Sequence, residues 1–194
     1  MKTILAPFPL LLAVSNLASC SYHTMETPIP PASSPPGAGW LTYTNNGYGF
    51  RLEYPPDARI APGATEILTR IFLPFTPGTT LRSKFLDISV QVGTPFCQSS
   101  LPYPKGNDLR GDLVIHKQTW LEEWFAESGS EVNADYHSYS AASGRVCLSL
   151  NFTLLHATPS TVLPPYNPLA ESQIFLDIAE TFQWLGGGAV TPTP

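Results

Sequence analysis

Apolar and polar residues alternate at every second position in three stretches of this sequence, and no other feature restricts the possible folds as strongly. The apolar positions are Phe50, Leu52 and Tyr54; then Leu86, Ile88, Val90 and Val92; then Val146, Leu148, Leu150, Phe152 and Leu154. Successive side chains of a β-strand point to opposite faces, so each stretch has one apolar and one polar face. This pattern is typical of antiparallel sheets that keep one face in water. We therefore predict an antiparallel sheet with a solvated outer face.

Turn signals join the predicted strands. Asn46-Gly47 favours a tight hairpin turn, and Ser143-Gly144 has a similar role later in the chain. On this basis strands are predicted at 41–44, 48–54, 66–73, 113–119, 135–141 and 145–155.

One helix is predicted near the end of the chain. Asn167 suits the N-cap, Pro168 the first helical position, and Glu171 the positive end of the helix dipole. The residues that then fall on one helical face are Ile174, Ile178, Phe182 and Leu185. The glycines at 186–188 would end this helix. We expect it to cover the apolar face of the sheet.

A second, short helix is predicted at 120–125, where apolar residues recur at helical spacing before Gly129. It contains Trp120, Trp124 and Phe125. These aromatic side chains could form an exposed partner-binding surface. The alternative, which we favour, is that the tryptophans pack into the core.

The N-terminus has the parts of a secretory signal: Lys2, an apolar stretch at 4–14, and small residues before Cys20. The tetrapeptide Leu-Ala-Ser-Cys at 17–20 resembles the bacterial lipobox, in which the cysteine is lipidated. An ordinary signal peptide with a chance cysteine is the alternative. A membrane span is disfavoured because the apolar stretch is short and contains prolines, whereas a span needs about 20 apolar residues. We expect lipidation at Cys20 and anchoring to the cell membrane or envelope on its extracytoplasmic side.

The remaining cysteines, Cys97 and Cys147, form one pair if Cys20 carries lipid. An exported protein meets an oxidising compartment, so we predict a disulfide between them. Cys147 lies on the polar face of its predicted strand, and Cys97 lies near the start of a long loop at 93–111. The bond would therefore hold this loop against the outer face of the sheet.

The sequence divides into a folded part and two flanking segments. We expect a signal peptide at 1–19, a lipidated cysteine with a Pro/Ser-rich tether at 20–39, one domain at 40–185 and a flexible tail at 186–194. Of the 194 residues, 43% are hydrophobic, which is enough for one packed core.

Composition and motifs disfavour several functions. The formal net charge is −5 and no run of Lys or Arg occurs, so nucleic acid is not an expected partner. No histidine or cysteine spacing predicts a metal site, and no glycine-rich loop predicts a cofactor, so we expect neither. No nucleophile elbow is present. His137 and His156 are the residues on which a hidden catalytic site would depend.

Three segments resemble a known family. The segment at 43–55, with Tyr-Gly-Phe at 48–50 and Tyr-Pro at 54–55, looks like the opening of PsbP-like domains. The segments at 145–156 and 170–185 resemble a strand and the terminal helix of small lipoproteins with such domains, common in filamentous bacteria of the Chloroflexi type. The resemblance implies an α+β fold, an antiparallel sheet flanked by helices in an α/β/α sandwich, and an extrinsic, non-enzymatic module.

Two classes of function follow as expectations. The first is a lipid-anchored extracytoplasmic binding or accessory module, with an envelope protein as the expected partner and the membrane reached through the N-terminal lipid. The second is a hydrolase-like enzyme whose hidden site uses His137 or His156. A cleft with two titratable groups of perturbed pKa would favour the enzyme, and a flat polar face would favour the binding module.

Overall fold

The computed structural model describes residues 36–37, 39–101, 109–158 and 162–186. Along the described chain the elements are β1 (Leu41–Asn45), β2 (Phe50–Tyr54), β3 (Arg59–Pro62), β4 (Ile67–Phe72), β5 (Leu81–Val92), β6 (Leu109–Ile115), β7 (Gln118–Ser128), β8 (Val132–Ser143), β9 (Val146–Ala157), α1 (Pro168–Thr181) and β10 (Gln183–Trp184). The predicted signal peptide and Cys20 lie outside the described residues, as do nearly all of the predicted tether and tail.

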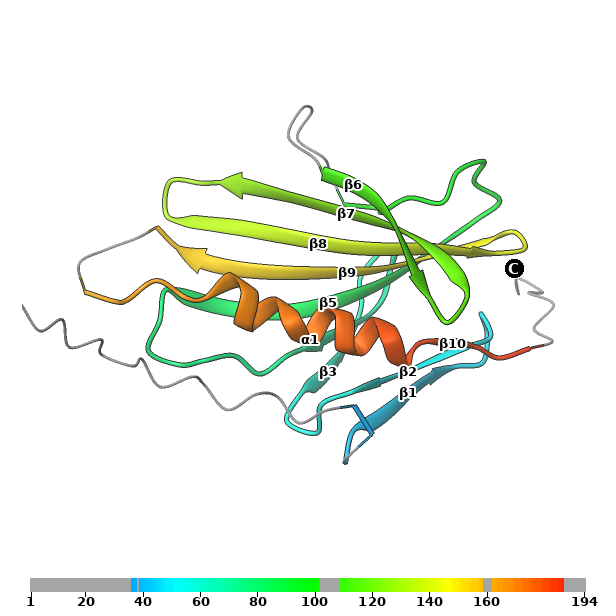
Figure 1. Cartoon of the computed structure of the whole chain (residues 1–194), viewed down its shortest axis with the longest axis horizontal. Coiled ribbons are helices and arrows are strands. Elements are labelled where there is room, and N and C mark those ends of the chain that lie inside the picture. The colour runs from blue at the N-terminus through cyan, green and yellow to red at the C-terminus, as the bar shows by residue number, and fades with distance from the viewer. Residues whose placement is uncertain (1–35, 38, 102–108, 159–161, 187–194) are drawn as a thin grey trace, which may run out of the picture.

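The strands form two antiparallel sheets. The larger has seven strands in the order β3-β4-β5-β9-β8-β7-β6, and the smaller has three in the order β1-β2-β10. Helix α1 lies across one face of the large sheet, and the β1–β2 hairpin lies beside the C-terminal end of α1 (Figure 1). The predicted α+β class, with one C-terminal helix over the sheet, is confirmed.

The core lies between the large sheet and α1, where the alternation of the sequence predicted it. β9 pairs with β5 along most of its length, so that Leu150 faces Ile88 and Phe152 faces Leu86. All four side chains are fully buried. Phe175 of α1 stacks on Phe152 with ring centroids 4.4 Å apart. Each such side chain stabilises the fold by about 1.5–3 kcal/mol on burial.

Helix α1 begins where the sequence predicted but ends earlier. The side chain of Asn167 accepts a hydrogen bond from the Ala170 amide, so the predicted N-cap is confirmed. The helix ends at Thr181 and Phe182 is already extended, so the predicted helical run to residue 185 and the stop at 186–188 are wrong. The chain leaves the helix because β10 pairs with β2.

Phe182, the first residue after α1, packs among aromatic rings. Its ring stacks on Phe50 and meets Trp120 and Trp184 edge-on, with centroids 5.0–5.8 Å away. Phe182 is therefore a core residue, as predicted, but through the extended residues after α1 rather than through a helical stripe.

The region 113–128 was predicted incorrectly. The expected short helix at 120–125 is part of strand β7, and the expected strand at 113–119 spans a hairpin whose turn residues His116 and Lys117 have φ of 49° and 67°. Positive φ at both central residues is the geometry of a tight hairpin turn, but neither residue type signals it. His116 Nε2 also hydrogen-bonds the carbonyl oxygen of Glu180 at the end of α1, which holds this turn in place.

Within the described residues, no helix is long and apolar enough to span a membrane.

Candidate functional site

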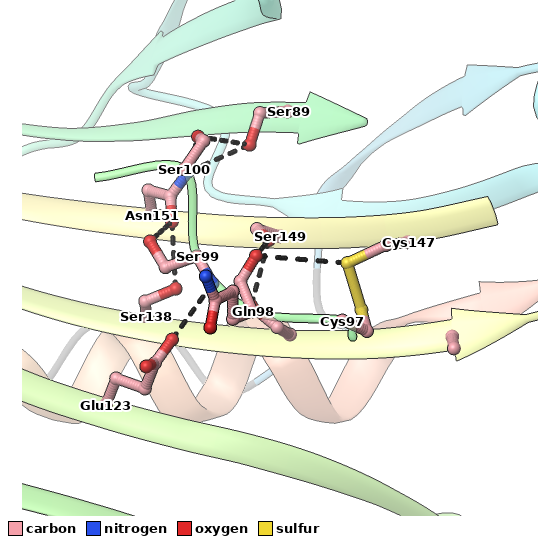
Figure 2. Close-up of a disulfide and its surroundings, with 12 residues drawn as sticks. Ser89, Cys97, Gln98, Ser99, Ser100, Glu123, Ser138, Cys147, Ser149 and Asn151 are labelled. Atoms are coloured by element: carbon pink, nitrogen blue, oxygen red, sulfur yellow. Dashed lines mark hydrogen bonds between the residues drawn. A yellow bond between two sulfur atoms is a disulfide. The ribbon is translucent and has the colours of Figure 1, made fainter. Parts of the chain in front are cut away.

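A disulfide fixes one loop to the outer face of the large sheet. The Cys97 and Cys147 sulfurs are 2.13 Å apart and the Cα atoms 5.1 Å apart. Cys147 lies on β9, on the face opposite the α1 core (Figure 2). The chain that continues from Cys97 therefore lies over the face that the sequence predicted to be solvated.

The loop is held by polar contacts rather than by apolar packing. The Ser99 hydroxyl donates to Asn151 Oδ1 at 2.8 Å, and the Ser99 amide donates to Glu123 Oε2 at 2.9 Å. Farther along, the Ser149 hydroxyl donates to the carbonyl oxygen of Gln98 at 3.3 Å. These contacts bury part of a polar face that sequence alternation alone assigns to water, and they agree with the expectation that the disulfide holds the loop against the outer face.

Asn151 is the centre of this network and is 1% exposed. Its Oδ1 accepts from Ser99 and Ser138, and its Nδ2 donates to Ser89 and Ser100, as Figure 2 shows. An amide side chain has two acceptor sites and two donor hydrogens, so all four are used. A fully satisfied buried network of this kind fixes one position of the loop.

Glu123 on β7 is a buried carboxylate with 0% exposure. Besides the Ser99 amide it contacts Arg110 of β6, whose Nε lies 3.3 Å from Oε1. Burial of a carboxylate is costly unless it is paired and hydrogen-bonded. The Ser99 amide and the Arg110 guanidinium supply both kinds of partner, so Glu123 connects the disulfide loop to strand β6.

A pocket with a volume of 320 Å³ lies on strands β6, β7 and β8, lined by Arg110, Gly111, Glu122, Trp124 and His137. Glu122 and Trp124 flank Glu123 in the sequence, so they point to the opposite face of β7. Gly111 pairs with Glu122, and His137 pairs with Trp124. The pocket is therefore on the α1 side of the sheet.

His137 is packed between aromatic rings at this pocket. Its ring lies 6.1 Å from Trp124 and 5.6 Å from Phe175. Burial lowers the pKa of His137 from 6.5 to about 4, and the negative charge of Asp135 opposes this effect only in part. The imidazole is therefore neutral at pH 7.

Glu122 has a partner within the sheet. Burial, the charge of Glu122 and a hydrogen bond to its carboxylate together raise the pKa of the Tyr139 phenol. Tyr139 is thus protonated at neutral pH and donates to Glu122.

His156 belongs to a separate cluster near the N-terminal end of α1. Its Nε2 lies 3.5 Å from Asp135 Oδ2, and the Tyr166 phenol donates to the same oxygen. These contacts join β8 and β9 to the segment that precedes α1. The structure thus keeps His137 and His156 in different surroundings, so they do not form one site.

Trp120, Trp124 and Phe125 do not form one exposed surface, and burial, which the sequence analysis favoured, holds for Trp120 but not for Trp124. Trp120 and Phe125 are each 1% exposed, whereas Trp124 is 36% exposed. Trp120 packs edge-on against Phe182 on the core side, and Phe125 stacks on Tyr136 on the outer side. The strand conformation of β7 sends neighbouring residues to opposite faces, so the possible exposed patch does not exist and, of the three, Trp124 contributes to a pocket.

Sequence reasoning did not find Arg110, Glu122, Glu123 or Asn151 as site residues. The helix expected at 120–125 gave no reason to place Glu122 and Glu123 on opposite faces. Strand alternation across Trp120, Glu122 and Trp124 was the signal that could have separated the pocket residues from the buried Glu123. Among the described residues no group of three or more His, Cys, Asp or Glu side chains could hold a metal ion.

Comparison with known proteins gives the fold. No protein-family model and no curated protein matches the chain. The solution structure of cyanobacterial PsbP (CyanoP) from Synechocystis sp. PCC 6803 is similar, with a TM-score of 0.50 at 8% identity, over 76% of this chain and 93% of that one. A crystal structure from Bacteroides thetaiotaomicron VPI-5482 has a TM-score of 0.51 at 11% identity, over 77% of this chain and 50% of that one.

The chain thus spans half the length of the Bacteroides protein that it matches. Identities this low carry no information on activity, but the structural similarity over about three quarters of this chain establishes the fold. The chain has a PsbP-like α+β fold.

Proposed function

We propose that this chain is a lipid-anchored, extracytoplasmic accessory module, and that it binds through the pocket on β6, β7 and β8. The sequence supports the anchor: a signal-like N-terminus ends in Leu-Ala-Ser-Cys at 17–20. An export route also agrees with the disulfide between Cys97 and Cys147. The expected partner is a component of the cell envelope.

The surroundings of His137 carry the binding part of this proposal. A general base works best with a pKa near the operating pH, and aromatic packing moves His137 well below that range. The other lining groups are the partly exposed indole of Trp124 and the carboxylate of Glu122. Such a lining supports recognition by contact and charge rather than proton transfer.

The hydrolase alternative has one favourable observation, the approach of Asp135 to His156 Nε2 at 3.5 Å. An oriented histidine of this kind can act as a base. However, the carboxylate oxygen that approaches His156 is also bonded by Tyr166, which gives the contact a structural role. Equal hydrolysis of p-nitrophenyl acetate by wild type and His156→Ala would exclude this alternative, and a large loss in the variant would support it.

Photo-crosslinking tests the binding proposal in the intact lipoprotein. A photoreactive phenylalanine analogue replaces Trp124 at the pocket or, as control, Leu169, which is 83% exposed on α1. After illumination of native envelopes, we expect one discrete adduct from position 124 and none from position 169. Adducts from 169 alone, or the same adducts from both positions, would contradict binding through the pocket.

A further inference from the structure

We propose that the pocket on β6, β7 and β8 binds a primary alkylammonium group. The inference rests on the proposed function, because it assigns a ligand class to the pocket through which the module binds. The observations that carry it are the pairing of charges around the pocket and the position of one aromatic ring.

The positive charge at the pocket is already compensated. Arg110 is a lining residue, but it pairs across the strands with Glu123, and its Nε lies 3.3 Å from Glu123 Oε1 on the face opposite Glu122. Glu123 is fully buried and has no solvent to stabilise its charge, so the Arg110 guanidinium is its counter-ion. Arg110 and Glu123 together therefore contribute no net charge, which weakens the attraction of an anionic ligand.

A negative charge remains. Glu122 lines the pocket and accepts a hydrogen bond from the neutral phenol of Tyr139, which leaves the carboxylate charge in place. Asp135 adds negative potential that is strong enough to act on His137. His137 itself is neutral. The groups that face the pocket thus sum to a negative site, which suits a cation.

The shape of the site suits an ammonium with a short alkyl chain. Trp124 exposes 36% of its surface beside Glu122 on the same face of β7, and an indole ring attracts ammonium groups through its negative face. A carboxylate next to an aromatic ring binds the charged head, while the ring contacts the alkyl part. The pocket volume of 320 Å³ is large enough for a small alkylamine.

Gly111 offers a way to close the pocket without changing its charge. It is the cross-strand partner of Glu122, and a Cβ added at Gly111 meets nothing within 4 Å. Valine is favoured in strands, so Gly111→Val should fold and fill part of the pocket.

The test is a titration of the purified full chain in dodecyl maltoside, followed by the indole N–H signal of Trp124 in NMR spectra. The probes are n-butylammonium, n-butanol and n-butyrate, which share one alkyl chain and differ in charge. We expect n-butylammonium to bind with saturation and the other two to bind at least about tenfold more weakly. The Trp124 signal is assigned as the one missing from Trp124→Phe.

Two variants locate the binding. Glu122→Gln should weaken n-butylammonium binding about tenfold, because the amide still accepts from Tyr139 but carries no charge. Gly111→Val should weaken all probes. Glu127→Gln, which removes an exposed carboxylate from the same strand, should leave binding unchanged.

The outcomes separate this inference from the proposed function. Equal or tighter binding of n-butyrate or n-butanol, or unchanged binding in Glu122→Gln, would overturn the ammonium assignment while leaving the pocket as a binding site. Absence of binding by every probe would overturn the ammonium assignment, and the crosslinking from position 124 would then decide whether the pocket binds at all.

Discussion

The backbone amide of Ser99 donates a 2.9 Å hydrogen bond to Glu123, and this contact links the disulfide-bonded loop to the strand that carries the pocket. The other oxygen of the same carboxylate pairs with Arg110, which lines the pocket. The order of the loop on the outer face and the position of Arg110 on β6 therefore depend on one buried side chain.

Glu123→Ala should destabilise the fold by about 1–3 kcal/mol, because it leaves the Ser99 amide without its acceptor and removes the counter-ion of Arg110. Glu127→Ala, an exposed change on the same strand, should stay within about 0.5 kcal/mol of wild type. Urea unfolding of the full chain measures both. If the two variants unfold at the same midpoint, Glu123 does not hold the loop.

Loss of the disulfide should cost about 4 kcal/mol, the entropy of closing a loop with a sequence separation of 50 residues. The variant carries Cys97→Ala together with Cys147→Ala. Its Ser99 amide should also exchange hydrogen faster than in the wild type, because only polar contacts then hold the loop. Mass spectrometry of a non-reduced digest provides the control, and two freely alkylated thiols in the exported wild type would contradict the bond.

The strands of the core were predictable from the sequence because burial on one face enforces strict alternation. Leu148, Leu150 and Phe152 all reach the α1 side, and the start of α1 at Asn167 follows from local capping chemistry. The number of cysteines also identified which two are bonded. The strands and the start of the helix depend on residues that are close together or evenly spaced in the sequence, whereas the disulfide followed from the cysteine count.

The secondary-structure predictions were wrong where tertiary contacts outweigh the local sequence pattern. Trp120 and Trp124 are four residues apart, a spacing that fits one face of a helix and equally one face of a strand. Phe182 was predicted to be helical, but it is extended after the end of α1 and stacks on Phe50, which is far away in the sequence. The strand pattern alone makes the outer face of β9 look solvated, because the loop that the disulfide holds there covers it with serine and backbone groups.

Phe182→Ala should cost about 3–5 kcal/mol, since it removes a ring that is 4% exposed among Phe50, Trp120 and Trp184. Gln183→Ala is the matched control at the next position. Its exposed hydrogen bonds to Arg51 should contribute less than about 0.5 kcal/mol. Similar urea midpoints for the two variants would show that the residues after α1 do not pack as described.

Stability should fall in acid partly through Glu171. Burial raises the pKa of Glu171, but hydrogen bonds from Lys84 and the Thr76 amide outweigh burial and bring it below the ordinary 4.5. A carboxyl with a lowered folded pKa stabilises the fold above pH 4.5 and loses this contribution as the pH falls through the folded value.

The stability difference between wild type and Glu171→Gln should therefore shrink as the pH falls below 4.5. Glu180→Gln, an exposed change on the same helix, serves as control. Unfolding curves across this pH range measure the difference. A gap between wild type and Glu171→Gln that stays constant with pH would mean that the ion pair with Lys84 is not the cause.

We propose that lipid on Cys20 holds the binding module at the extracytoplasmic side of a membrane. Metabolic labelling with an alkyne-tagged fatty acid tests it most directly, on cells that produce either the wild type or Cys20→Ala. We expect label on the wild type, which fractionates with membranes, and none on the variant, which stays unprocessed or becomes soluble after export. Equal labelling of both proteins, or a wild type that carries no label, would contradict the account.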